Sequence, residues 1–210
     1  DQEEVWNLRT GTIKNLSYRG QTLTVEELSL ANKTITIQGK GQLLTSNDYP
    51  LQGTLKSQVL PVGYEPIIAH GRVDGPLNKL TIEADFQNPF PVQLSGRLNN
   101  LLGSANWQAR VESPEVVLNK IHQDWPEQHF TKVVIDGQGT LDDYALLVNS
   151  QAGLPQLKEL SGLSAELRGN GDSIRINTLH LTQGKSELSA KGNLAWNPVF
   201  SWQAEVSGSH

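Results

Sequence analysis

The segment Leu80-Thr81-Ile82-Glu83-Ala84-Asp85-Phe86 decides the fold class, because apolar and polar side chains alternate in it one by one. Successive side chains of a β-strand point to opposite faces, so this period of two predicts a strand with one dry and one wet face. The same alternation recurs in residues 92–98, 105–111, 133–141, 188–196 and 200–206. The sequence therefore predicts a protein that is nearly all β.

Short polar segments rich in asparagine, aspartate, glycine and proline separate the predicted strands, as is typical of tight turns. Strands that follow one another through connections this short form an antiparallel meander. The candidate turns are Asn32-Lys33, Gly75-Pro76-Leu77-Asn78, Asn99-Asn100, Asp142-Asp143, Asn170-Gly171-Asp172, Gln183-Gly184-Lys185 and Asn197-Pro198.

Glycine recurs within the predicted strands, two residues after an apolar side chain. A glycine in mid-strand marks a bulge, a bend or a close approach of another group. Glycines at equivalent places in successive hairpins would bend the sheet along one line and make a trough. The repeat is found at Ile37-Gln-Gly39, Leu51-Gln-Gly53-Thr-Leu55, Leu94-Ser-Gly96-Arg-Leu98, Ile135-Asp-Gly137, Leu167-Arg-Gly169 and Ala190-Lys-Gly192-Asn-Leu194.

One segment has the pattern of a helix. Ser113 is suited to cap it, Pro114 suits its first turn, and Val117, Leu118 and Ile121 fall on one side. We therefore expect residues 113–130 to form a helical or loop insertion in a single β-domain that covers residues 1–210.

Composition excludes several classes of protein. The 210 residues carry a net charge of −5, which argues against a nucleic acid or an anionic membrane as the partner. Cysteine is absent, so disulfides, thiolate metal sites and thiol catalysis are excluded. No apolar run approaches the roughly 18 residues of a membrane span. Since methionine is also absent, we expect a piece of a longer protein, with any anchor outside it.

No residue pattern indicates an enzyme, a cofactor or a metal. The Gly-x-Gly steps at Gly39, Gly137 and Gly169 do not open a helix, so they lack the helix N-terminus that holds a phosphate. No histidines have metal-ligand spacing, and no Ser-His-Asp arrangement or paired general acid and base is recognisable. We expect a protein without catalytic residues, cofactor or metal.

An ordered string of motifs between residues 133 and 207 resembles the TamB family of the AsmA-like superfamily. Residues 37–43 and 51–55 resemble the same repeat. The motifs of the string are Gly137-Gln-Gly139-Thr-Leu141-Asp-Asp143-Tyr144, Gly153-Leu-Pro155, Gly169-Asn-Gly171, Leu179-His-Leu181, Gly184-Lys-Ser-Glu-Leu188, Leu194-Ala-Trp196 and Phe200-Ser-Trp202.

The resemblance implies a long, strongly curved antiparallel sheet that forms an open, U-shaped hydrophobic groove, the β-taco. Proteins of this family are anchored in the Gram-negative inner membrane by an N-terminal helix and reach across the periplasm. They are implicated in moving phospholipids towards the outer membrane, and in outer-membrane protein assembly with the barrel TamA. The family's C-terminal region, where contact with TamA is expected, is not recognisable here, so we expect that contact outside this chain.

Residue pattern and resemblance together predict a lipid-lined face. We expect phospholipid acyl chains to contact eleven residues: Ile35, Ile37, Ile82, Leu94, Trp107, Ile135, Leu167, Ile176, Leu188, Leu194 and Trp202.

Two alternatives remain open at this point. The alternating face is also compatible with the core of a closed sandwich or barrel. A binding module is the second alternative, in which exposed sheet edges accept a strand of an unfolded outer-membrane protein. A carbohydrate enzyme built on a β-helix is less favoured, because no acidic cleft is recognisable. A closed sandwich buries its apolar face, whereas a trough leaves that face partly accessible to solvent.

Overall fold

The computed structural model describes residues 10–46, 48–60, 66–121, 124–153, 161–197 and 200–209. Leu154, Pro155 and Pro198 of the predicted motifs and turns lie outside these residues. The elements are β1 (Thr10–Arg19), β2 (Thr22–Ala31), β3 (Ile35–Leu44), β4 (Pro50–Val59), β5 (Ile67–Pro76), β6 (Lys79–Phe86), β7 (Val92–Asn99), β8 (Asn106–Val117), α1 (Leu118–Ile121), β9 (His129–Gly139), β10 (Tyr144–Gly153), β11 (Ser161–Gly169), β12 (Ser173–Gln183), β13 (Ser186–Ala195) and β14 (Ser201–Ser209).

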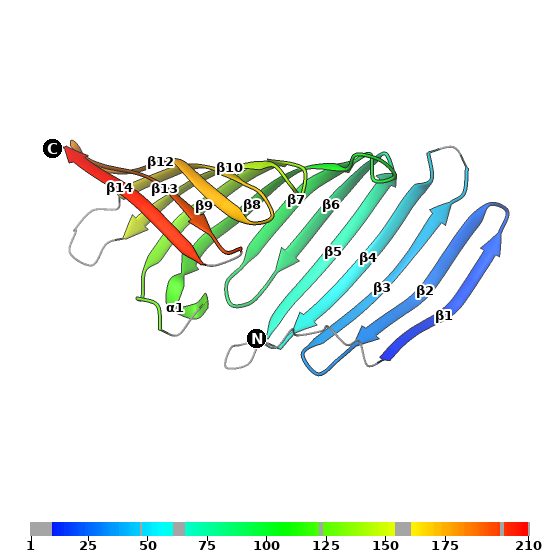
Figure 1. The fold of residues 1–210 in the computed structure, drawn as a ribbon. Helices are drawn as coiled ribbons and strands as arrows, with labels where there is room; N and C mark the ends of the chain where they lie inside the picture. The colour runs from blue at the N-terminus through cyan, green and yellow to red at the C-terminus, as the bar shows by residue number, and fades with distance from the viewer. Residues whose placement is uncertain are drawn as a thin grey trace.

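All fourteen strands belong to one sheet, and their order in space is their order in the sequence. Each strand pairs antiparallel with its chain neighbours, so β1 and β14 are the two edges and the sheet does not close on itself (Figure 1). The predicted all-β, open antiparallel sheet is confirmed. The six strand segments predicted from alternation fall on β6, β7, β8, β9, β13 and β14.

The turns gather along two rims. Rim A holds the turns that follow the odd-numbered strands, from β1–β2 to β13–β14, and rim B holds the turns that follow the even-numbered strands. For β1 to β5, rim A lies at the top of Figure 1. The described residues of all seven predicted turns connect consecutive strands, which confirms the meander.

The predicted helix begins too early. Ser113 and Pro114 lie inside β8, which runs to Val117, and only Leu118–Ile121 is helical. The Ser113 hydroxyl donates to the backbone oxygens of Pro91 (2.7 Å) and Glu115 (2.8 Å), so it does not cap a helix. Pairing with β9 satisfies the backbone of β8 as far as Val117. This pairing prevails because a helix of one or two turns is marginal by itself.

The glycines inside the strands permit close approach of neighbouring strands. A Cβ on Gly192 would lie 2.5 Å from the backbone oxygen of Gln203 in β14. A Cβ on Gly137 would lie 2.8 Å from the ring of Trp107, which occupies the space above that glycine. Both positions therefore require glycine for packing, which explains why the repeat interrupts otherwise regular strands.

No second layer of described residues covers the sheet. The chain exposes 14569 Å² of solvent-accessible surface, against about 9,700 Å² for a compact protein of this mass. Among the described residues only four hydrophobic side chains are buried, namely Leu80, Val117, Ala152 and Ala165. A closed sandwich or barrel would bury its whole inner face, so this architecture is excluded.

Candidate functional site: the apolar face of the sheet

Cross-strand pairing places apolar side chains or glycines from each of the fourteen strands on one face, here called the apolar face. Two neighbouring rows of directly paired residues define it. The first row is Ile13, Leu28, Gly39, Leu55, Gly71, Ala84, Leu94, Val111, Ile135, Val148, Ala165, Leu179, Ala190 and Val206. The second row, nearer rim A, is Leu16, Val25, Gly41, Gly53, Val73, Ile82, Gly96, Ala109, Gly137, Leu146, Leu167, Ile176, Gly192 and Ala204.

Both rows cross the sheet from β1 to β14 without a polar side chain. Every position is isoleucine, leucine, valine, alanine or glycine. Neighbouring strands lie about 4.8 Å apart, so thirteen spacings make a path of roughly 62 Å. The two rows therefore form a continuous apolar path along the direction in which the strands stack.

The eleven residues predicted to contact lipid share this face. Leu94 and Ile135 are in the first row, and Ile82, Leu167 and Ile176 are in the second. Ile35, Ile37 and Leu188 lie on the rim B side of the two rows, and Trp107, Leu194 and Trp202 lie on the rim A side.

None of the eleven is buried. Nine are half-buried, whereas Leu188 and Trp202 are 41% and 72% exposed. Such side chains pack against their neighbours in the sheet and keep their outer surface free of protein contact.

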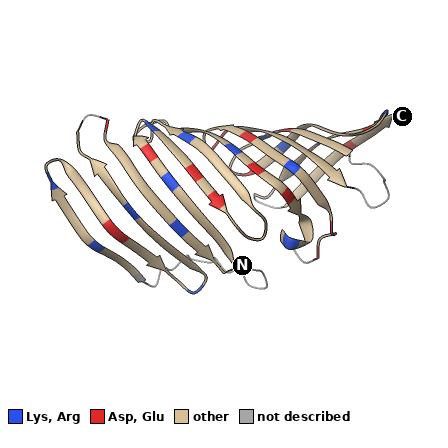
Figure 2. Cartoon of the chain, turned by 180° about the vertical axis from the view of Figure 1, so that it is seen from behind, with Lys and Arg blue, Asp and Glu red and all other residues tan. Residues whose placement is uncertain are grey.

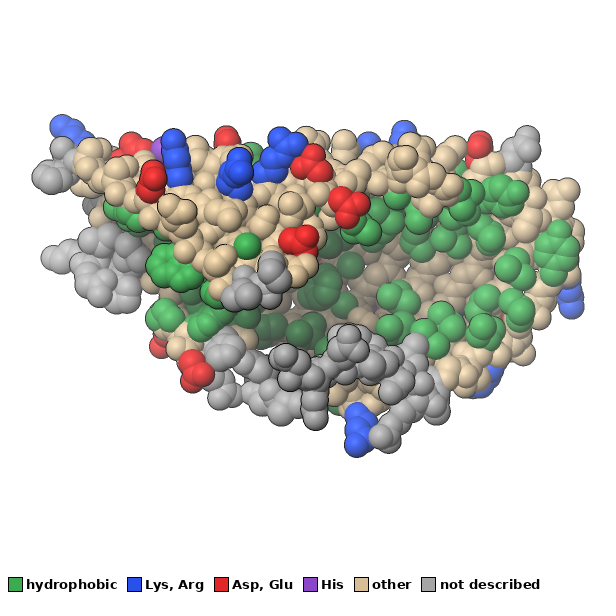
Figure 3. All heavy atoms as spheres, in the orientation of Figure 1, with side chains coloured by type: hydrophobic (Ala, Val, Ile, Leu, Met, Phe, Trp, Pro, Cys, Tyr) green, Lys and Arg blue, Asp and Glu red, His purple; other side chains and the backbone are tan. Residues whose placement is uncertain are grey.

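The N-terminal half of the apolar face is hollowed. Its lining, from β1 to β6, includes Ile13, Val25, Leu43 and Leu55, and the hollow has a volume of about 600 Å³. This is within the range of small-molecule sites. Figure 3 shows the hollow with hydrophobic side chains on its walls and charged side chains outside it.

These four residues were missed by the site prediction. Leu43 and Leu55 flank the glycine repeat that was recognised in β3 and β4. Val25 and Ile13 lie next to the irregular pairing of β1, β2 and β3, where strict alternation no longer assigns a face. The glycine repeat is the signal in the sequence that could have identified Leu43 and Leu55.

The opposite face of the sheet is polar and solvated. Arg72 reaches Glu83 at 2.8 Å, and Arg110 reaches Asp136 at 2.9 Å, each across a strand boundary. Charges of both signs are interleaved along the strands and do not gather into a patch of one sign (Figure 2). Exposed ion pairs of this kind contribute little to stability. These charged side chains keep the outer face hydrated.

Two carboxylates of the described chain have a lowered pKa, and in both cases the cause is a hydrogen bond to a neighbouring side chain. Asp143 accepts from Arg168 at 2.8 Å, which lowers the pKa of its carboxyl. The pKa of Glu187 is lowered by His180 at 2.6 Å and then by Ser189. These pairs are exposed and lie outside the two apolar rows, whose residues carry no titratable group.

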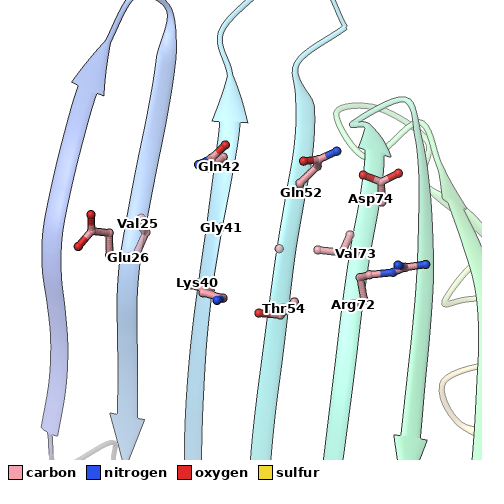
Figure 4. A pocket seen from close by; sticks show the side chains of 11 residues that line it. Val25, Glu26, Lys40, Gly41, Gln42, Gln52, Thr54, Arg72, Val73 and Asp74 are labelled. Carbon is pink, nitrogen blue, oxygen red and sulfur yellow. The ribbon is translucent and has the colours of Figure 1, made fainter.

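A second concavity lies over the paired glycines Gly41 and Gly53. The polar side chains of Lys40, Arg72 and Asp74 surround it, with glutamines and a threonine between them (Figure 4). Its charges are of both signs, and Arg72 is already held by Glu83. This hollow belongs to the solvated outer side of the sheet.

The described residues contain no group of three histidine, aspartate or glutamate side chains placed to hold a metal ion. No described helix has the length and hydrophobicity to cross a membrane.

A single-layer, open antiparallel sheet with one continuous apolar face defines a β-groove protein. The comparison with family models identifies the family to which the chain belongs. The model for the TamB N-terminal domain matches residues 8–210, and the chain belongs to that family. This family consists of transport and assembly proteins of the periplasm and outer membrane. The searches of curated proteins and of solved structures gave no match.

Proposed function

We propose that this chain is a segment of a bridge across the periplasm that carries phospholipids between the inner and outer membranes. The observation that supports the proposal most is the pair of complete apolar rows, which run through all fourteen strands and which no other described element covers. A large exposed apolar surface marks a binding surface in a folded protein. Its continuity suits a ligand that moves along it.

The energetics favour a groove for such a ligand. A phospholipid with two chains has about 30 methylenes, and exposing them to water costs roughly 24 kcal/mol at about 0.8 kcal/mol each. The apolar face removes most of that cost, while the open side leaves the headgroup hydrated. Both rows hold only aliphatic side chains and glycines, so no polar contact in them would hold a lipid at one strand. Transit from one strand to the next is then a series of small steps.

The same proposal includes the cellular setting. The chain lies in the periplasm as part of a protein that a helix outside these residues anchors in the inner membrane. The outer-membrane barrel TamA is a partner of the full-length protein, and its contact lies outside this chain. Family membership supports this setting.

Quenching of tryptophan fluorescence tests lipid binding by the groove. Trp107 lies on the apolar face, so brominated acyl chains of a phospholipid are expected to quench it. The intensity lost to quenching should fall in Trp107→Phe. It should be unchanged in Trp125→Phe, because Trp125 lies in the β8–β9 connection. Equal quenching in the wild type and both variants would contradict lipid contact at this face.

The open sheet edges favour a second function, assistance in outer-membrane protein assembly by strand addition. Every residue of β14 is exposed, and its outer edge has no partner strand within the described chain. Saturable binding of an outer-membrane strand peptide, prevented by proline substitutions in β14, would support this alternative. Binding of that kind depends on backbone groups and tolerates changes of the aliphatic side chains.

A further inference from the structure

Tyrosine and tryptophan have an uneven distribution over the described strands. The four such residues in strands are Tyr18, Trp107, Tyr144 and Trp202. Each lies within two positions of the rim A end of its strand, in β1, β8, β10 and β14. Pairing places all four on the apolar face, in the row next to the second row.

The polar tips of Tyr18, Trp107 and Tyr144 reach the turns of rim A. The Tyr18 hydroxyl lies 3.1 Å from Oγ1 of Thr45 in the β3–β4 turn. Trp107 Nε1 donates to the backbone oxygen of Thr140 in the β9–β10 turn at 3.0 Å. Each ring therefore lies on apolar surface while its polar tip lies at the wet edge.

The pattern continues along rim A. The Tyr144 hydroxyl donates to the backbone oxygen of Asn170 at 3.4 Å, and Trp196 Nε1 donates to that of Gly171 at 2.9 Å. Gly169 makes room for the first of these rings, because a Cβ there would lie 2.5 Å from Tyr144. Tyrosine and tryptophan with this division between ring and tip are enriched where a lipid meets water.

The rim B side of the apolar face is different. The aromatic strand residues near rim B are Phe86, paired with Ala69 and Val92, and Phe130, paired with Val116 and Ala152, and neither has a polar tip. Aliphatic side chains such as Ile35 and Val59 surround the strand ends on this side. In the described strands, the residues suited to a lipid–water boundary thus occur at rim A.

Charge favours a headgroup that contains an amine. The charged residues of the described rim A turns are all aspartates, and Asp48, Asp142 and Asp172 among them take part in no ion pair within the described chain. The described rim B connections carry charges of both signs, namely Lys33, Lys120, Asp124, Glu127 and Lys185. Carboxylates beside aromatic rings attract an ammonium group and repel a headgroup whose only charge is its phosphate.

We propose that a phospholipid occupies the groove with an amine-bearing, zwitterionic headgroup along rim A and its acyl chains on the first and second rows. This orientation rests on the proposed function, and it adds which rim the headgroup follows and which headgroup class the rim prefers. The aromatic row is then the boundary between acyl chains and headgroup.

A single strand provides matched probe positions. Ser104 follows β7 at rim A, Gln87 precedes β7 at rim B, and Leu94 lies between them in the first row. The chain has no cysteine, so Ser104→Cys, Gln87→Cys and Leu94→Cys each accept one nitroxide label. The probe is phosphatidylethanolamine in detergent micelles, and the measurement is paramagnetic relaxation of its phosphorus and terminal acyl methyl signals.

We expect the label at Ser104→Cys to relax the phosphorus several-fold more than the label at Gln87→Cys, and the label at Leu94→Cys to relax the acyl methyls most. Acyl relaxation at Leu94→Cys with equal or reversed phosphorus effects at the rims would overturn the orientation and leave the proposed function intact. Absence of relaxation from all three labels would overturn both.

The headgroup preference is tested by comparing the affinities of two phospholipids that differ in their headgroup. Phosphatidylethanolamine should bind about two- to fivefold more tightly than phosphatidylglycerol with the same acyl chains, as expected for exposed charges. Asp142→Asn should reduce this ratio towards one. A preference for phosphatidylglycerol, or a ratio that Asp142→Asn leaves unchanged, would overturn the assignment of an amine-bearing headgroup.

Discussion

Ile135→Asp is expected to stop phospholipid transfer while the sheet stays folded. Ile135 lies in the first row between Val111 and Val148 and is half-buried, so in the empty groove a carboxylate there keeps contact with water. An acyl chain that passes the position would have to strip that water, and an unpaired buried charge costs several kcal/mol. At about 1.4 kcal/mol for each factor of ten, transfer should slow by about 100-fold or more.

The opposite face provides the control. Asn193 lies next to Leu194 in β13 and is paired with Arg175 and Gln203 on the outer face. Leu194→Asp should block transfer as Ile135→Asp does, whereas Asn193→Asp should leave it normal. The measurement is the arrival of newly made, radiolabelled phospholipid in the outer membrane, with resistance to proteolysis as the test of folding. Normal lipid flow in both folded inward variants would refute the groove as the path.

Gly192→Ala is expected to destabilise the C-terminal end of the sheet. The added Cβ would lie 2.5 Å from the backbone oxygen of Gln203, so β14 must shift away from β13. Overpacking of this kind costs about 1–3 kcal/mol. For a domain of this size, a loss of that amount lowers the Tm by roughly 2–12 °C. Thermal unfolding followed by circular dichroism measures the shift.

Gly171 is the matched control for this substitution. It lies in the β11–β12 turn, and a Cβ there would meet nothing within 4 Å. Gly171→Ala should therefore leave the Tm within about a degree of the wild type. If Gly192→Ala unfolds at the same temperature as Gly171→Ala, the glycines of the second row are not needed for close approach of the strands.

The strands of this fold follow from the sequence, because alternation is a local signal. In segments such as 80–86 and 92–98, the alternation of apolar and polar residues assigns each side chain to one face of the sheet. The strands β6 and β7 coincide with these segments. The open shape was expected from the glycine repeat and from the family resemblance. Absence of a second layer is a property of the whole chain, so the burial in the structure was needed to decide against a sandwich.

Local irregularities explain what alternation failed to predict. In β12 the inward positions change from Ile174 and Ile176 to Leu179 and Leu181, because the register shifts between Ile176 and Leu179. A strict period of two assigns the last pair to the wrong face. The helix prediction failed for a related reason, since Ser113-Pro114 has the pattern of a helix start, whereas pairing with the next strand, β9, decides its structure.

Photocrosslinking in living cells tests the central claim, lipid on the apolar face, most directly. A crosslinking amino acid is placed at Ile37, Ile135 and Leu194, with outward controls at their neighbours Thr36, Asp136 and Asn193, in cells labelled with radioactive phosphate. Phospholipid adducts at the three inward positions and none at the three controls are the expected result. Absence of lipid adducts at the inward positions, with protein adducts at the sheet edges, would contradict the lipid path and favour the assembly function.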